Sequence, residues 1–286
     1  MNKKIFILLL VFILTSTYLH GVVAQKKVKL PIQVNPLVKE LEMVPGSTIK
    51  KGITIKSTEE KPISVTIAYR DFRLTKDGNL KLIEAGKSNR SLGSYINFSS
   101  RSFILDPGGE REIEYKINLP NSADKPHWGT LIIAPKILNN QENGEGKKEK
   151  EEMKFKINFK YSYRHVIIQR STNSPPPQGR MANLTITGTG KDKVKETTLE
   201  ATFSNTGKAI TKCQGYVEIF DDKGQKIKRY DFVQDRFVFP KSKRTFSQSL
   251  SGLDLKSGEY LAVAIIDFGG ENVVGGRYRF TIPEGI

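Results

Sequence analysis

The chain has 286 residues and carries 46 Lys and Arg residues against 30 Asp and Glu residues, a formal net charge of +16. With 37% hydrophobic and 27% charged residues, its composition is that of a folded chain, and its length suits about two domains. A single Cys excludes an internal disulfide and a cysteine-built metal site, and three His leave little material for metal binding or acid–base chemistry. Composition therefore argues against an enzyme, and we expect no metal and no cofactor.

The N-terminus has the pattern of an export signal. Lys3 and Lys4 precede an unbroken apolar run at 5–14, and small residues precede an expected cleavage after Ala24. The run is shorter than the roughly 20 residues that a membrane-spanning helix needs. We therefore predict a cleaved signal peptide at 1–24 and no stable membrane insertion. The basic charge favours anionic partners, but export makes nucleic acid an unsuitable one.

The mature chain reads as short strands separated by turns, which is typical of all-β sandwiches. Apolar and polar residues alternate in most of these segments, as they do in strands with one buried face. The strands expected in the first half are 30–34, 48–56, 63–69, 103–105, 113–119 and 128–134. Turns are expected at 76–79 and 106–109, where Gly accepts a positive φ at low cost.

The segment after these strands has a different composition. Residues 139–152 carry no apolar side chain, so we expect a long mobile loop there. Met153, Phe155 and Ile157 then begin an alternation that places apolar residues on one face of an extended strand as far as Tyr163. Two interpretations remain open: a core strand of its own sandwich, or a strand whose early part is free to pair with another protein.

A proline-rich stretch at 171–180 predicts a linker, because consecutive prolines do not enter the interior of a sheet. The expected domains are therefore 28–170 and 181–286. Strands predicted in the second are 183–187, 198–203, 216–220, 237–239, 244–250, 260–267 and 278–282. Cys213 is expected to be a small buried hydrophobe. The predicted fold is all-β, with two immunoglobulin-like sandwiches in tandem after the signal peptide.

Several short markers occur in the order of a known family. They are Val34-Asn-Pro36 with Pro45-Gly46 beyond it, the strand at 63–69, the apolar strand and Pro-Gly turn at 103–108, Leu119-Pro120, and Lys160-Tyr-Ser-Tyr-Arg164. On these residues the segment 30–170 resembles the periplasmic pilus-assembly chaperones, which pair two immunoglobulin-like domains. The second half matches that family poorly and looks more like the immunoglobulin-like domains of bacterial surface proteins.

The resemblance implies a function and a set of site residues. Met153, Phe155 and Ile157 would belong to a strand that is donated to an unfinished subunit. Lys160 matches one of two basic residues that hold the subunit's terminal carboxylate. The position of the other is Val38, so the adjacent Lys39 is the candidate substitute. The implied partners are protein subunits with an exposed strand edge, with an outer-membrane usher left open as a further one. The implied location is the periplasm, or outside the cell where the source lacks an outer membrane.

Two other functions remain as alternatives. A secreted immunoglobulin-like module that binds cell-wall polymer or another envelope protein fits the same composition. A sugar-cleaving enzyme would need two facing carboxylates, and the sequence identifies no such pair. The motifs Gly-x-Ser-x-Gly and His-Glu-x-x-His are both absent from the chain. We therefore predict a chaperone without enzymatic activity, with the surface module as the alternative.

Overall fold

The computed structural model describes residues 30–138, 161–187, 197–250, 253 and 255–283, and these form strands and no helix. The all-β prediction is therefore confirmed for the described part of the chain. In the first half the strands are β1 (Ile32–Asn35), β2 (Val38–Met43), β3 (Thr48–Ser57), β4 (Ile63–Leu74), β5 (Leu80–Ile83), β6 (Ile96–Phe98), β7 (Ser102–Leu105), β8 (Glu110–Asn118), β9 (His127–Ile137) and β10 (Tyr163–Ser171).

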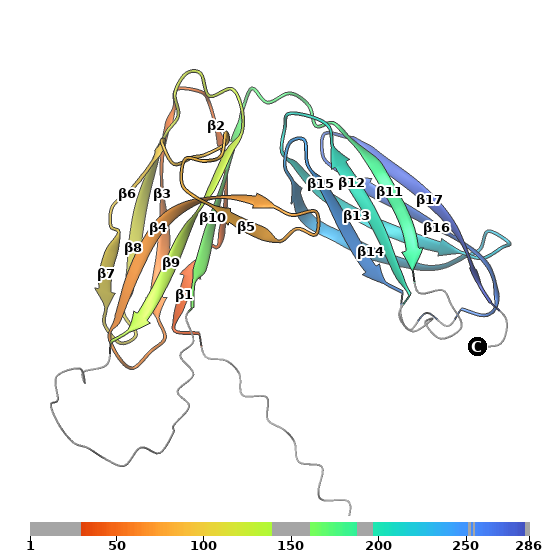
Figure 1. Cartoon of the computed structure of the whole chain (residues 1–286), viewed down its shortest axis with the longest axis horizontal. Helices are drawn as coiled ribbons and strands as arrows, with labels where there is room; N and C mark the ends of the chain where they lie inside the picture. The colour runs from red at the N-terminus through yellow and green to blue at the C-terminus, as the bar shows by residue number, and fades with distance from the viewer. Residues whose placement is uncertain (1–29, 139–160, 188–196, 251–252, 254, 284–286) are drawn as a thin grey trace, which may run out of the picture. The chain divides into compact units, whose positions relative to one another are not determined.

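Two sheets form the first sandwich (Figure 1). One has the order β1-β3-β8-β6, and the other has the order β2-β10-β9-β4-β5, with β7 also beside β4. An immunoglobulin fold places its strands in the order A-B-E-D in one sheet and G-F-C-C′ in the other. The observed order matches this arrangement if β1 and β2 are the two halves of strand A. The immunoglobulin-like prediction is thus confirmed by the topology.

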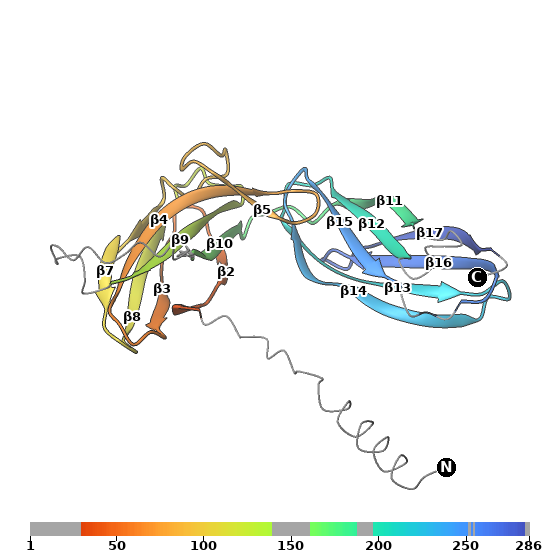
Figure 2. The same ribbon diagram turned by 60° about the horizontal axis from the view of Figure 1, so that its bottom comes forward.

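The second half has the same architecture. Its strands are β11 (Gly179–Thr187), β12 (Thr198–Asn205), β13 (Thr211–Phe220), β14 (Lys226–Val238), β15 (Lys243–Ser249), β16 (Gly258–Asp267) and β17 (Val273–Ile282). They form the sheets β11-β12-β15 and β14-β13-β16-β17, which lie in two layers (Figure 2). This order corresponds to A-B-E and C′-C-F-G.

Each sandwich has its own hydrophobic core. Ile53, Ile113 and Leu131 are fully buried in the first, and Phe203 and Ile219 in the second. Buried residues recur at every second position along a strand, as Ile113, Tyr115 and Ile117 do in β8, because alternate side chains of a strand lie on one face. Cys213 also lies in the second core with no exposed surface, as expected. Burial of such side chains contributes roughly 1.5–3 kcal/mol each before the cost of ordering the chain.

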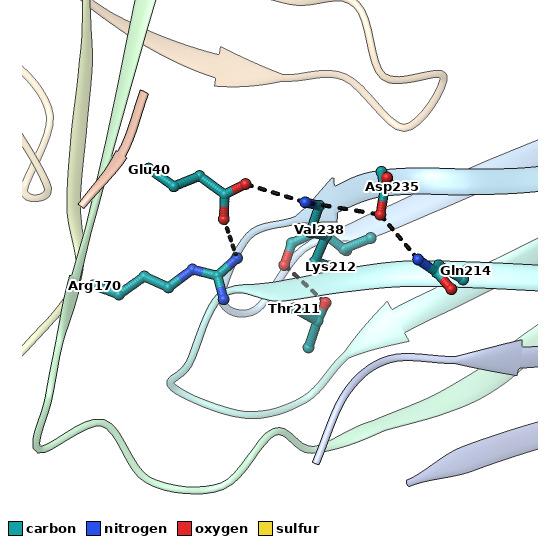
Figure 3. A network of polar contacts seen from close by, with 7 residues as sticks. All are labelled: Glu40, Arg170, Thr211, Lys212, Gln214, Asp235 and Val238. Carbon is teal, nitrogen blue, oxygen red and sulfur yellow. Dashed lines mark hydrogen bonds and ion pairs between the residues drawn. The ribbon is translucent and has the colours of Figure 1, made fainter. Parts of the chain in front are cut away.

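A polar network joins β2 and β10 to β13 and β14 (Figure 3). The carboxylate of Glu40 lies 3.0 Å from the Arg170 guanidinium and 3.2 Å from the Lys212 ammonium. Lys212 also lies 3.7 Å from Asp235, which accepts a hydrogen bond from Gln214 at 3.0 Å. These groups are half-exposed, so each ion pair contributes only about 0–1 kcal/mol.

An apolar cluster accompanies this network. Phe72, Trp128 and Ile168 pack with Ile210 and Phe239, and all five are buried. The Trp128 indole N–H donates to the carbonyl of Phe72 at 3.1 Å. Burial of an apolar side chain contributes more free energy than an exposed ion pair does. This cluster therefore supplies most of the stabilisation where Phe72, Trp128 and Ile168 meet Ile210 and Phe239.

Most predicted strands and both predicted turns occur in the structure. Gly78 and Gly108 have φ values of 82° and 66°, as their turns require. The prediction missed β2, β5 and β6, and it missed most of β10 and of β14. Ser171 still belongs to β10 and Gly179 begins β11, so the proline-rich segment between them is shorter than expected. The signal peptide and the loop at 139–152 lie outside the described residues, and the division at 171–180 stays a prediction.

A close approach at Gly129 provides a test of the first core. A Cβ added there would overlap the ring of Tyr69, whose hydroxyl donates to Asp71 at 2.6 Å and accepts from the Leu92 N–H at 2.8 Å. Because these bonds hold the ring in place, Gly129→Ala should lower the free energy of unfolding by about 1–3 kcal/mol, as overpacking does. Urea denaturation measures this change.

Gly52→Ala is the matched control, because Gly52 also lies in a strand. A Cβ there would meet only the end of the Glu112 side chain, which is free to move aside at the surface. We expect a change within about 0.5 kcal/mol, as for ordinary surface positions. Equal losses for the two variants would contradict the packing at Tyr69.

Candidate functional site

The first strand of the sandwich changes sheets. β1 pairs with β3 in one sheet, whereas β2 pairs with β10 in the other. The change takes place at Pro36 and Leu37, and the Asn35–Pro36 peptide bond is cis. β2 reaches β10 only from the Val166 position onward, where the Val166 N–H donates to the carbonyl of Leu37 at 2.8 Å.

This change of sheets leaves one edge of β10 open at its start. Tyr163, Arg164 and His165 are in register with β9 on one side, but the described residues include no register partner for them on the β2 side. An unpaired strand edge exposes backbone N–H and C=O groups that another strand can complete. The open edge lies directly after residues 139–160, which include the predicted donor strand.

His165 holds the two halves of the first strand in place. Its side chain has no exposed surface, and its Nδ1 lies 2.6 Å from the carbonyl oxygen of Pro36. The carbonyl accepts, so Nδ1 carries the proton, and Nε2 accepts from the Tyr115 hydroxyl at 3.2 Å. Burial lowers the pKa of His165, and the nearby charge of Lys39 lowers that pKa further. The point where the strand changes sheets is therefore held by an uncharged imidazole.

Lys39 is the one predicted site residue within the described part of the chain. Side chains alternate along β2, so Lys39 shares a side with Leu41 and Met43, which are buried. Val38 and Glu40 point to the opposite side and are exposed. Lys39 thus lies on the core side of the sheet, near His165. Its role as a carboxylate anchor stays a prediction, and Met153, Phe155, Ile157 and Lys160 lie outside the described residues.

Sequence reasoning did not identify Arg70. Register places Val38, Val166, Thr130 and Arg70 in one row across β2, β10, β9 and β4. Paired residues of adjacent strands point to the same face, so these side chains lie on the outer face of the sheet.

Arg164 lies in the neighbouring row of the same face, beside Ile132 and Ala68. Arg70 and Arg164 are both exposed, and among the described residues neither has an acidic partner. The Arg70 guanidinium donates to the carbonyl of the adjacent Tyr69 at 3.0 Å. An outer face with two exposed guanidinium groups therefore adjoins the open edge of β10. The sequence shows both arginines at polar positions of alternating strands, but only the pairing register brings them to one face.

Comparison with known proteins gives results from solved structures alone, since no family model and no curated protein matches the chain. One similar structure is the CsuC–CsuE chaperone–tip adhesion subunit complex of Acinetobacter baumannii, at 10% identity and a TM-score of 0.46, covering 86% of this chain and 98% of the other. The class 5 fimbriae chaperone CfaA gives 9% identity and a TM-score of 0.43, with the same coverage.

A PapD-like domain of human CEP192 is also similar, at 10% identity and a TM-score of 0.34, covering 53% of this chain and 94% of that one. The first two structures are described as chaperones of pili or fimbriae, the family that the sequence markers resemble. At these identities and scores, the function has to be argued from the residues of the chain itself. Among the described residues, no helix is long and apolar enough to cross a membrane.

The lowered pKa values of the two buried histidines predict how the free energy of unfolding depends on pH. Burial lowers the pKa of His165 and of His127, whose backbone N–H donates to Gln169 at 3.0 Å. In the unfolded chain both histidines titrate near their ordinary pKa of about 6.5. Below that pH the unfolded state binds more protons, so the free energy of unfolding should fall as pH decreases from 7 to 5.

Replacement of His165 removes one of these titrating groups. His165→Gln keeps a donor for Pro36, and it should reduce the pH dependence of unfolding by up to about 1.4 kcal/mol per pH unit. Urea denaturation at pH 7, 6 and 5 measures the slope for the parent and the variant. An unchanged slope would show that His165 is not held neutral in the folded protein.

Proposed function

We propose that this protein is a periplasmic chaperone-like protein that binds and caps pilus or surface-protein subunits by donating a β-strand. The open edge of β10 before Val166 is the observation that carries the proposal. A subunit that lacks one strand has a groove that needs backbone partners and apolar side chains, and a free strand edge supplies both. The proposed activity requires no catalytic group.

The donated residues follow from continuation of β10 toward the N-terminus. If the strand remains regular upstream of Tyr163, steps of two place Ile157, Phe155 and Met153 on one face. Each apolar side chain that enters a subunit groove would contribute roughly 1.5–3 kcal/mol before ordering costs. Lys154 and Lys156 on the alternate face would oppose pairing between two copies of the same strand.

The outer face of the sheet supplies the charge for such a complex. By the same alternation, Lys160 shares the face of Arg164, and Arg70 lies one row away on β4. We propose that these cations hold a carboxylate of the bound subunit, since charge-assisted hydrogen bonds to guanidinium are strong and directional. Lys39, the other predicted carboxylate anchor, lies on the core side of the sheet, and its charge also acts on His165.

Crosslinking in the intact envelope tests strand donation. A photoreactive amino acid at Met153 should form adducts with surface-protein subunits, identified by mass spectrometry. Phe155→Asp or Ile157→Asp should abolish these adducts, because a buried carboxylate without a partner costs several kcal/mol.

Asn158→Asp is the matched control, because it introduces the same side chain on the alternate face. It should leave the yield of adducts unchanged. If all three variants crosslink as the parent does, strand donation is wrong. If adducts form with cell-wall polymer in every variant, the surface-module alternative is correct.

The cationic face gives a separate prediction. Arg164→Glu and Arg70→Glu should each weaken subunit binding by roughly 10- to 100-fold, the loss expected for one charge-assisted hydrogen bond of about 1.5–3 kcal/mol. Arg73→Glu serves as a control, because it lies on β4 outside the rows that contain Arg70 and Arg164. Titration of a purified subunit with each variant measures the dissociation constants. Equal losses of affinity in all three variants would show that binding depends on the net charge of the protein and not on the positions of Arg70 and Arg164.

A further inference from the structure

One strand of the second sandwich is apolar on both faces. Ala262, Ala264 and Ile266 of β16 point into the core, while the alternate positions on the outer face carry Leu261, Val263 and Ile265. An antiparallel sheet with a solvent-facing side normally alternates apolar and polar residues. β8 does so, with charged residues at its outer positions 110, 112, 114 and 116. The outer face of β16 is therefore built for contact with another surface.

Register shows what surrounds this apolar column. Leu261 lies between Phe220 of β13 and Arg279 of β17. In the next row, Val263 lies between Glu218 and Arg277. The column thus has an aromatic residue and a carboxylate on its β13 side, and two guanidinium groups on its β17 side.

The same face is hollowed at both ends of the column. One hollow of about 730 Å³ is lined by Tyr216, Ile265 and Val273 together with polar residues. A second hollow of about 400 Å³ is lined by Phe220 and Leu261. Ligand and partner surfaces of proteins are commonly concave with an apolar floor and a few polar groups. Such a floor receives protruding side chains, whereas a bilayer needs protruding apolar groups to insert.

Charges on the two sides of the column are complementary. Arg277 and Arg279 are exposed, and among the described residues neither lies in an ion pair. Glu218 lies on the opposite side, 3.2 Å from Lys226 and 3.9 Å from Arg229, which both belong to β14. Asp222, in the turn after β13, is exposed and lines the hollow beside Phe220. Cations therefore lie along β17, and the carboxylates along β13 include Glu218, which already has cationic neighbours on β14.

We infer that this face binds a second copy of the chain. A twofold axis parallel to β16 would exchange the two sides, so that Arg277 of one copy faces Glu218 of the other. Arg279 would face Phe220, with Asp222 in the turn directly after it. The two columns of Leu261, Val263 and Ile265 would then pack against each other at about 10 Å, the usual distance between stacked sheets. Such an interface is isologous and closes as a dimer. It is independent of the proposed strand donation, since it lies on the other sandwich.

Charge reversal on either side tests the dimer. Sedimentation velocity of the full mature chain across the micromolar range should show a dimer for the parent. The double variants Arg277→Glu/Arg279→Glu and Glu218→Lys/Asp222→Lys should each self-associate at least about tenfold more weakly, because like charges then face each other. An equimolar mixture of the two variants should restore the dimer, since the mixed pair has opposite charges on both sides.

Controls separate this result from misfolding and from net charge. Lys56→Glu/Lys116→Glu makes the same change of charge on the outer face of the first sandwich and should remain dimeric. Restoration by mixing also requires that both double variants fold. A parent that is monomeric throughout the range, or dimers that survive both double variants, would overturn the inference. Binding of the parent to vesicles of phosphatidylcholine and phosphatidylglycerol, lost in Arg277→Glu/Arg279→Glu, would assign the face to anionic lipid instead.

Discussion

The need to pair every backbone N–H and C=O group of a sheet is the constraint on which the first sandwich depends. Its first strand serves both sheets, because β1 completes the edge beside β3 and β2 completes the edge beside β10. One short chain segment cannot cover both edges over their full lengths. Among the described residues, the start of β10 therefore has no partner strand on one side, and the proposed function uses this open edge.

The division is maintained from the inside. His165 is the last of the open residues of β10, and its ring connects the Pro36 carbonyl to the Tyr115 hydroxyl. A charged residue at this buried position would be costly, and an apolar residue would leave the carbonyl of Pro36 without this donor. The neutral imidazole meets both requirements. Structure around the open edge is thereby coupled to the core of the sandwich and does not depend on surface contacts alone.

Local pattern predicted much of the fold. Strands with strict alternation, such as 63–69 and 113–119, were predicted correctly because one face of each packs in a core. β14 was largely missed, since it is an edge strand whose side chains are mostly exposed and whose register with β13 is interrupted by bulges. Arg70 was missed for another reason. Whether it shares a face with Arg164 depends on the register between β4, β9 and β10, and the sequence of a single strand does not reveal that register. The donor residues at 153–157 were assigned from pattern and resemblance, and they remain a prediction.

The lone thiol of the chain has a practical consequence. Cys213 has no exposed surface, and burial raises its pKa to about 11, so at neutral pH it is neither accessible nor ionised. Alkylating reagents will therefore modify it only when the second sandwich opens. The rate of alkylation of Cys213 therefore measures how often the second sandwich opens. Engineered surface cysteines can also be labelled with fluorophores in the native protein, because Cys213 does not compete for the reagent.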